Sequence, residues 1–148
     1  MIINTRRFGE IKIDPSKMLT FPEGMIGFGL RRRYVVLPFA EGTPFELLQA
    51  VDEPNLAFVI INPFLFRPDY RFDLSDEDLE AIQAKDVKDV SIRVIVTLPR
   101  NLAQMTANLQ GPVLINETKL LARQVVLKNT DYSLTHPILP PAASTGAK

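Results

Sequence analysis

The amino-acid sequence predicts a mainly β fold, a small antiparallel β-barrel-like domain with one or two short helices. Apolar residues recur mostly with a period of two, which is typical of strands whose alternate side chains face opposite sides. About eight such runs are separated by turn-forming residues, a spacing typical of all-β domains. Closure into a barrel removes the exposed strand edges that would otherwise promote aggregation.

The clearest predicted strand is the run from Val90 to Leu98. Its apolar face is expected to hold Val90, Ile92, Val94, Val96 and Leu98, opposite Ser91, Arg93, Ile95 and Thr97. The run from Met105 to Asn116 also alternates, but Gly111 and Pro112 interrupt it. Because proline has no N–H to donate to a neighbouring strand, we expect a sheet edge or a bulge there.

Shorter runs predict further strands at Arg7–Ile13, Tyr34–Phe39, Phe45–Val51, Leu56–Asn62 and Gln124–Leu127. The turn-forming residues Asp52 to Asn55 lie between the third and fourth of these runs and predict a hairpin. Leu56 to Ile61 is apolar on both faces, so we expect it to be a central strand.

One segment predicts a helix. Ser75 is a good N-cap for the acidic residues Asp76, Glu77 and Asp78, which suit the positive end of a helix dipole. Apolar residues at Leu79 and Ile82 follow at helical spacing, and the helix is expected to end before Asp86. A second helical turn is possible at Leu102–Gln104.

Length and composition predict one globular domain, residues 1–139, followed by a disordered tail, residues 140–148. The 17 basic and 17 acidic residues give a net charge of zero, which argues against a protein that binds nucleic acid through its phosphates. The absence of cysteine excludes disulfides, thiolate metal sites and a cysteine nucleophile. The sequence has neither a secretory signal nor an apolar run long enough to cross a membrane, so we expect a cytoplasmic protein.

No set of residues predicts catalysis. His136 is the only histidine and has no motif around it, so local packing is the favoured interpretation. The carboxylates cluster at Asp69, Asp73, Asp76, Glu77, Asp78 and Glu80. Acids at a helix start are usually solvated, and their spacing does not match a calcium loop. We therefore expect no enzyme activity, no metal and no cofactor.

Arg31, Arg32 and Arg33 form the one basic run. A solvated turn before a strand is the favoured interpretation, since no RNA-binding motif or aromatic ladder accompanies it. An RNA-binding β-barrel module is the alternative function.

The loop from Asn62 to Tyr70 places Phe64, Phe66 and Tyr70 at even spacings beside acidic residues. Core packing and an exposed set of aromatic interface anchors are both open for these rings. On the second interpretation, the partner-binding residues would be Phe64, Phe66, Asp69, Tyr70, Asp76, Glu77 and Asp78.

The chain resembles the family of bacterial flagellar assembly factors FliW. Eight stretches carry the resemblance in family order: Thr5–Ile13, Phe21–Phe28, Leu48–Phe58, Asn62–Tyr70, Ser75–Leu79, Met105–Pro112, Gln124–Leu127 and Tyr132–Pro137. Asn62 stands where the family often has Asp, and Gly111 where it often has Leu or Ala. Neither position is a catalytic group in the family.

The resemblance implies a small β-barrel-like protein, monomeric when free, with two protein partners and no direct contact with nucleic acid or membrane. One partner is flagellin, the filament subunit. The other is CsrA, the carbon storage regulator, an RNA-binding dimer that represses flagellin translation. Export of flagellin would release the family member to bind CsrA away from its RNA surface, which would relieve repression allosterically.

Overall fold

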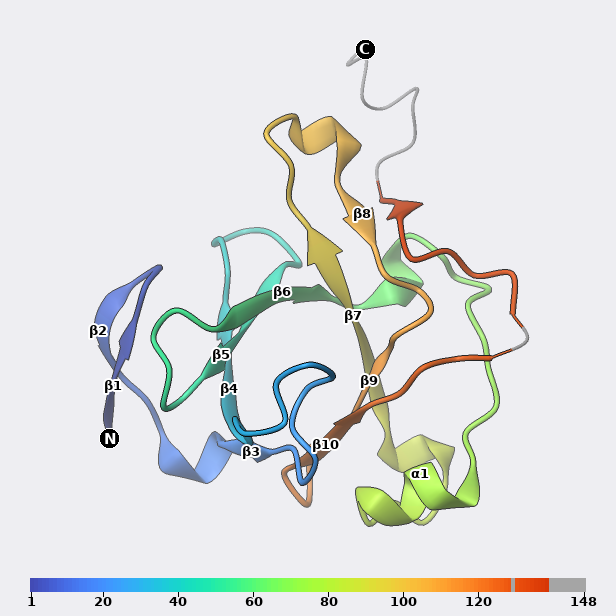
Figure 1. Ribbon diagram of the computed structural model, residues 1–148, viewed down its shortest axis with the longest axis horizontal. Helices are drawn as coiled ribbons and strands as arrows, with labels where there is room; N and C mark the ends of the chain where they lie inside the picture. The colour runs from blue at the N-terminus through green and yellow to red at the C-terminus, as the bar shows by residue number, and fades with distance from the viewer. Residues whose placement is uncertain (129, 139–148) are drawn as a thin grey trace.

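The computed structural model describes residues 1–128 and 130–138, and within them seven strands close into a barrel (Figure 1). Around the ring the order is β3, β4, β5, β6, β7, β9 and β10, with hydrogen-bonded pairing between neighbours and between β10 and β3. The ring strands are β3 (Leu19–Thr20), β4 (Arg33–Pro38), β5 (Glu46–Ala50), β6 (Ala57–Ile61), β7 (Ser91–Thr97), β9 (Val113–Asn116) and β10 (Leu121–Gln124). This confirms the predicted fold class.

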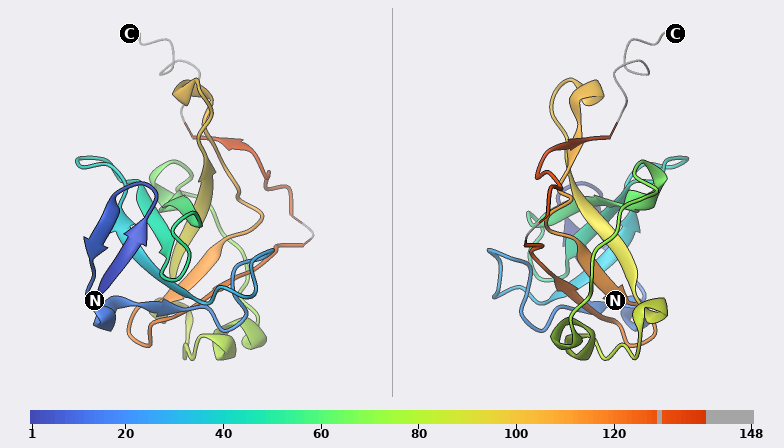
Figure 2. Two further views of the ribbon diagram at one scale, coloured as in Figure 1. Left: turned by 60° about the vertical axis from the view of Figure 1, so that its left-hand side comes forward. Right: turned by 90° about the vertical axis from the view of Figure 1, so that its right-hand side faces the viewer.

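In the described part of the chain, four further strands lie outside the ring. Strands β1 (Ile2–Thr5) and β2 (Gly9–Lys12) form a separate antiparallel hairpin. Strand β8 (Thr106–Ala107) pairs with the end of β7, and β11 (His136–Pro137) pairs with β8. The hairpin that joins β7 to β8 projects beyond the end of the barrel (Figure 2).

One pair in the ring departs from the antiparallel prediction. Strands β3 and β10 are parallel, with Thr20 opposite Leu121, and the N–H of Thr20 donates to the carbonyl of Leu120 at 2.9 Å. Leu120 has a φ of +58°, a conformation that costs a side-chain-bearing residue about 1–2 kcal/mol. Because β3 has two residues, its periodicity is too short to be recognised in the sequence.

The predicted central hairpin is confirmed. Strands β5 and β6 pair antiparallel, and β6 lies between β5 and β7. The buried side-chain amide nitrogen of Gln49 donates to the carbonyls of Ala50, Glu53 and Leu56 at 3.1–3.2 Å, which ties down the intervening turn. Both faces of β6 are covered, since Ile60 and Ile61 belong to different core clusters.

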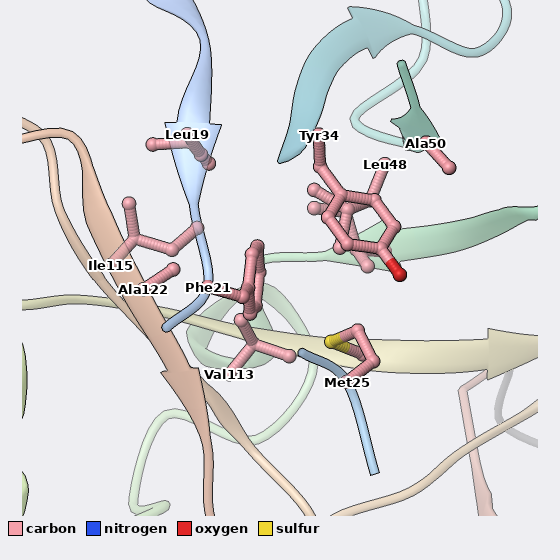
Figure 3. Close-up of a cluster of buried hydrophobic side chains, with 10 residues drawn as sticks. Leu19, Phe21, Met25, Tyr34, Leu48, Ala50, Val113, Ile115 and Ala122 are labelled. Carbon is pink, nitrogen blue, oxygen red and sulfur yellow. The ribbon is translucent and has the colours of Figure 1, made fainter. Parts of the chain in front are cut away.

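The main core lies inside the barrel, where side chains from six strands and the loop after β3 converge (Figure 3). Its fully buried members include Phe21 and Tyr34, whose rings meet edge to face with centroids 5.0 Å apart. Burying one large apolar side chain contributes about 1.5–3 kcal/mol. The cluster consists of Leu19, Phe21, Met25, Tyr34, Leu48, Ala50, Ile60, Val113, Ile115 and Ala122.

A second cluster covers the opposite side of β6 and β7. It consists of Ile61, Tyr70, Val94, Val96, Met105, Ala107, Leu109 and Ile138. The segment after β6 and the last described residues of the chain therefore pack on the outside of the barrel. The predicted apolar face of β7 is confirmed for Val94 and Val96, whereas Leu98 lies past the end of the strand and is exposed.

The predicted strand from Met105 to Asn116 is wrong as one element. It divides into β8 and β9, which both pair with β7. On β7, Arg93 pairs with Val113 and Val96 pairs with Ala107. Two residues lie between Arg93 and Val96, whereas five lie between Ala107 and Val113 on the opposite segment. The bulge expected around Gly111 is therefore present. The side chain of Asn108 holds it by accepting hydrogen bonds from the N–H groups of Gln110 and Gly111.

Other predicted boundaries shift. The strand expected at Gln124–Leu127 is instead β10, which ends at Gln124, although the N–H groups of Val125 and Leu127 still donate to the segment before β9. The run Arg7–Ile13 contains β2, while β1 was not predicted. The predicted tail, residues 140–148, lies outside the described residues.

The predicted helix is α1 (Asp76–Ala81), capped by Ser75, whose Oγ accepts from the N–H of Asp78 at 3.0 Å. Its C-cap, Ile82, is fully buried, and the side chain of Asn116 donates to the Ile82 carbonyl at 2.9 Å. Short 3₁₀ helices are η1 (Pro15–Lys17), η2 (Pro63–Leu65), η3 (Val87–Asp89) and η4 (Leu102–Gln104). Among the described residues, no helix combines the length and apolar character that spanning a bilayer requires.

The loop after β3 generates a stability prediction. Gly24 and Gly27 both have positive φ, but a Cβ on Gly24 would lie 2.6 Å from the Cα of Gly29, whereas nothing lies within 4 Å at Gly27. We expect Gly27→Ala to lower the free energy of unfolding by about 1–2 kcal/mol. Gly24→Ala should cost about 1–3 kcal/mol more, because the backbone must move. Urea denaturation measures both losses, and equal losses would contradict the packing argument.

Candidate partner-binding surface

The segment after β6 carries the aromatic residues that the sequence singles out. The side chain of Asn62 accepts from the N–H of Phe64 at 3.0 Å and so starts η2. The rings of Phe64 and Tyr70 lie close together, with centroids 6.2 Å apart. Phe64 is 41% exposed, and Phe66 is half-buried and stacks on the imidazole of His136, with centroids 5.8 Å apart.

Tyr70 is a core residue, which corrects its place among the candidate interface anchors. It is 3% exposed, and its hydroxyl donates to the carbonyl of Leu109 at 2.6 Å. The rings of Phe72 and Tyr132 lie 5.3 and 4.7 Å from its centroid. Burial raises the pKa of the Tyr70 phenol. Of the two interpretations left open by the sequence, core packing holds for this ring.

A groove of about 470 Å³ lies between the 62–74 segment and the residues that lead into β7. Its apolar lining includes Phe64, Phe72, Leu74, Val87 and Ile92. Phe64 and Val87 are exposed on its border, while the ring of Tyr70 forms part of its wall. Val87 was not predicted as a surface residue, because the fold and not the sequence spacing brings it opposite Phe64.

Asp69 does not share an ion-pair network with the acids of α1. Its carboxylate contacts Nε of Arg67 at 2.7 Å, and this hydrogen bond lowers the pKa of the Asp69 carboxyl. The Arg67 guanidinium also lies 5.2 Å from the ring centroid of Tyr132. The acidic residues predicted as one set therefore divide into two places on the molecule.

The acids of α1 meet Arg123 of β10, which the sequence analysis missed. Nη2 of Arg123 contacts Glu77 at 3.0 Å, and its Nε contacts Asp78 at 3.3 Å. Glu23, in the loop after β3, approaches Nη1 at 3.6 Å. Asp76 is exposed and has no ion pair among the described residues. No sequence signal links Arg123 to these acids, since each lies far from it along the chain.

The loop after β3 carries a second set of exposed apolar side chains. Ile26, Phe28 and Leu30 are exposed, Leu30 at 96%, while Phe21 and Met25 of the same loop are buried in the barrel. The ring of Phe28 meets Phe58 of β6 with centroids 5.5 Å apart. The sequence analysis assigned no surface role to this loop.

The basic run is largely neutralised by the β5–β6 turn. Arg33 contacts Asp52 at 2.7 Å and Arg31 contacts Glu53 at 3.6 Å, all with partly exposed side chains. This fits the favoured interpretation of a solvated turn before a strand, which is β4.

His136 packs as the sequence predicted, since it lies on β11 against Phe66. Burial, and next the positive charge of Arg67, lower the pKa of the imidazole, whereas Asp69 acts in the opposite direction. Within residues 1–128 and 130–138, no group of three or more histidine or acidic side chains is arranged to hold a metal ion.

Comparison with known proteins decides the family. The model of the family described as FliW protein matches residues 2–138. The chain belongs to the FliW family. The flagellar assembly factor FliW of Natranaerobius thermophilus is 42% identical over 139 residues, covering 93% of this chain and 92% of the relative. That of Bacillus subtilis is 36% identical over 138 residues, covering 93% and 96%.

A solved FliW structure has the same fold. The crystal structure of the flagellar assembly factor FliW superposes with a TM-score of 0.89 at 39% identity, covering 95% of this chain and 98% of that one. The family resemblance carried by the eight sequence stretches is confirmed.

The contrast between Tyr70 and Phe64 can be tested by stability. Tyr70→Phe leaves the buried Leu109 carbonyl without its donor, so we expect a loss of about 1–3 kcal/mol in the free energy of unfolding. Phe64→Ala, at an exposed ring, should cost about 1 kcal/mol or less. Chemical denaturation of both variants checks the order, and a larger loss at Phe64 would contradict it.

The lowered pKa of His136 predicts a pH effect. The unfolded chain, with an ordinary value near 6.5, binds a proton before the folded chain does. This contribution to stability is therefore complete above about pH 6.5 and is lost as the pH falls toward the folded pKa. His136→Gln should reduce the loss of unfolding free energy between pH 7.5 and 5.5. An identical loss in both proteins, measured by urea denaturation, would refute the assignment.

Proposed function

We propose that this chain is a cytoplasmic flagellar assembly factor that binds flagellin and CsrA in alternation. When it is bound to flagellin, CsrA is free to repress flagellin translation. When flagellin is exported, the chain binds CsrA, antagonises it allosterically and relieves repression. The protein acts by binding alone and catalyses no reaction.

The observation that carries the proposal is family membership over nearly the whole described chain. Residues 2–138 match the FliW family, and the relatives are named flagellar assembly factors. The described surface is consistent with a binding protein, since it offers an apolar groove and an acidic helix on a rigid barrel. Preorganised surfaces of this kind reduce the ordering cost of association.

We assign the first turn of α1 to CsrA, because carboxylates complement the basic surface of an RNA-binding protein. Asp76 and Glu77 are exposed, and the Glu77 side chain retains 81% of its accessible surface despite its contact with Arg123. Complementary charge at such positions speeds encounter and makes association depend on salt. Asp78 has a mostly buried side chain and is better suited to orienting Arg123.

We assign the groove bordered by Phe64 and Val87 to an apolar segment of flagellin. Exposed aromatic and aliphatic side chains around a concave surface are typical of the centre of a protein interface. Phe66 supports the wall through its stacking on His136, and Tyr70 keeps the 62–74 segment in place from inside.

Alternation requires that the two partners disfavour each other. A coupling free energy of about 1–3 kcal/mol changes each affinity about 5- to 150-fold, and the effect must be reciprocal. No overlap of the two sites is needed for coupling of this size.

Competition titration with purified flagellin and CsrA tests the proposal. Each protein should bind the chain alone, and saturating flagellin should weaken CsrA binding by at least about fivefold. Asp76→Lys combined with Glu77→Lys should weaken CsrA binding about threefold to tenfold, with a shallower salt dependence and unchanged flagellin binding.

The matched control reverses two exposed acids away from α1, Glu10 and Glu41. Because it changes the net charge by the same amount, it separates a local contact from bulk electrostatics. Failure of both partners to bind the wild-type chain would refute the proposed function. Equal effects of the two charge reversals would refute the assignment of α1.

A further inference from the structure

Arg123 connects two surface elements that are distant in sequence. Its guanidinium contacts Glu77 and Asp78 of α1 and Glu23 of the loop after β3, so three carboxylates share one positive charge. The Arg123 side chain is 19% exposed, whereas those of Glu23 and Glu77 are 70% and 81% exposed. A small cleft of about 120 Å³, lined by Pro22, Gly24, Ala81 and Ala122 among others, separates the loop from the helix.

The next residue on β10 also holds the loop. The side-chain oxygen of Gln124 accepts from the N–H of Ile26 at 3.1 Å, and its amide nitrogen donates to the carbonyl of Gly111 at 3.1 Å. Two adjacent side chains of one strand therefore fix the loop that presents Ile26, Phe28 and Leu30. Figure 1 shows this loop and α1 in the region around β10.

We propose that Arg123 couples the acidic turn of α1 to the apolar loop of residues 22–30, so that engagement of one surface changes the position and order of the other. The three carboxylates compete for one guanidinium. When a cationic group of a partner takes up Glu77 and Asp78, Arg123 is released toward Glu23 and holds the loop more tightly. When Arg123 is drawn toward α1, its contact with Glu23 weakens. The hydrogen bond from Ile26 to Gln124 then remains as the contact from β10 that holds the loop.

The charge balance explains why this arrangement responds to a partner. Three carboxylates around one arginine leave an excess of two negative charges, so repulsion between the carboxylates weakens each pair while the other two are charged. Glu23, at 3.6 Å, is the longest of the three contacts and gains most when the other two are removed. Neutralising α1 also removes repulsion between its acids and Glu23, which acts in the same direction.

This inference rests on the proposed function only for the identity of the partner that engages α1, and it adds a second surface, the apolar loop, that such a partner would affect. The apolar loop and the acidic helix are different surfaces, so coupling through Arg123 lets a partner on one surface alter binding on the other without overlap. Its test uses the free chain, so the outcome does not depend on whether flagellin or CsrA binds.

Hydrogen exchange of loop amides, followed by NMR, tests the coupling in the purified full chain. The reporters are the N–H groups of Gly24, Ile26 and Phe28, which donate within the loop or to Gln124. Glu77→Gln combined with Asp78→Asn should slow their exchange about two- to fivefold, the change expected from strengthening one exposed ion pair. Arg123→Gln should accelerate it, since Glu23 then faces the α1 acids with no cation between them.

Asp76→Asn is the matched control, because it removes a charge from the same helix turn without touching Arg123. It should leave the loop amides unchanged. The coupling is refuted if the double substitution leaves loop exchange unaltered or if Asp76→Asn slows it equally. If the loop responds but neither flagellin nor CsrA binds the wild-type chain, the coupling stands and the proposed function fails.

Discussion

The N–H of Thr20 donates to the carbonyl of Leu120, and with the parallel pairing of Thr20 and Leu121 this contact closes a ring of seven strands. Closure satisfies backbone groups that an open sheet would leave at its edges. It also encloses the core around Phe21 and Tyr34. Leu120 adopts a positive φ where the two strands meet, so closing the barrel places backbone strain at this residue.

Closure also determines what β10 can present to solvent. Within the strand, Ala122 points into the core, whereas Arg123 points outward to the acids of α1 and to Glu23. Because successive side chains of a strand point to opposite faces, β10 contributes one residue to the core and the next to the surface ion-pair network. The loop after β3 also contributes to both the core and the surface, since it buries Phe21 and Met25 and exposes Ile26, Phe28 and Leu30.

The closed barrel carries short surface elements. The charged and apolar surfaces lie on loops, 3₁₀ turns and a helix of six residues, while the ring strands hold them in place. Small changes in such elements leave the core undisturbed, because the core residues are contributed mainly by the strands. Competition between carboxylates for Arg123 is one way in which a surface of this kind can respond to a partner.

The sequence by itself determined the β-barrel class, the β5–β6 hairpin, the Ser75 cap of α1 and the packing role of His136. These features depend on residues close together in the chain, where period, capping and turn chemistry act directly. The eight family stretches likewise identify the FliW family from the residues alone.

Tertiary structure alone decided the parallel β3–β10 closure, the burial of Tyr70, the position of Val87 beside Phe64 and the convergence of three carboxylates on Arg123. A strand of two residues has no readable period, and the even spacing of Phe64 and Tyr70 does not reveal that the first ring is exposed and the second buried. Glu23, Glu77 and Arg123 come from three distant segments. Their contact exists because the closed barrel brings the loop after β3, α1 and β10 together, and nothing local in the sequence encodes it.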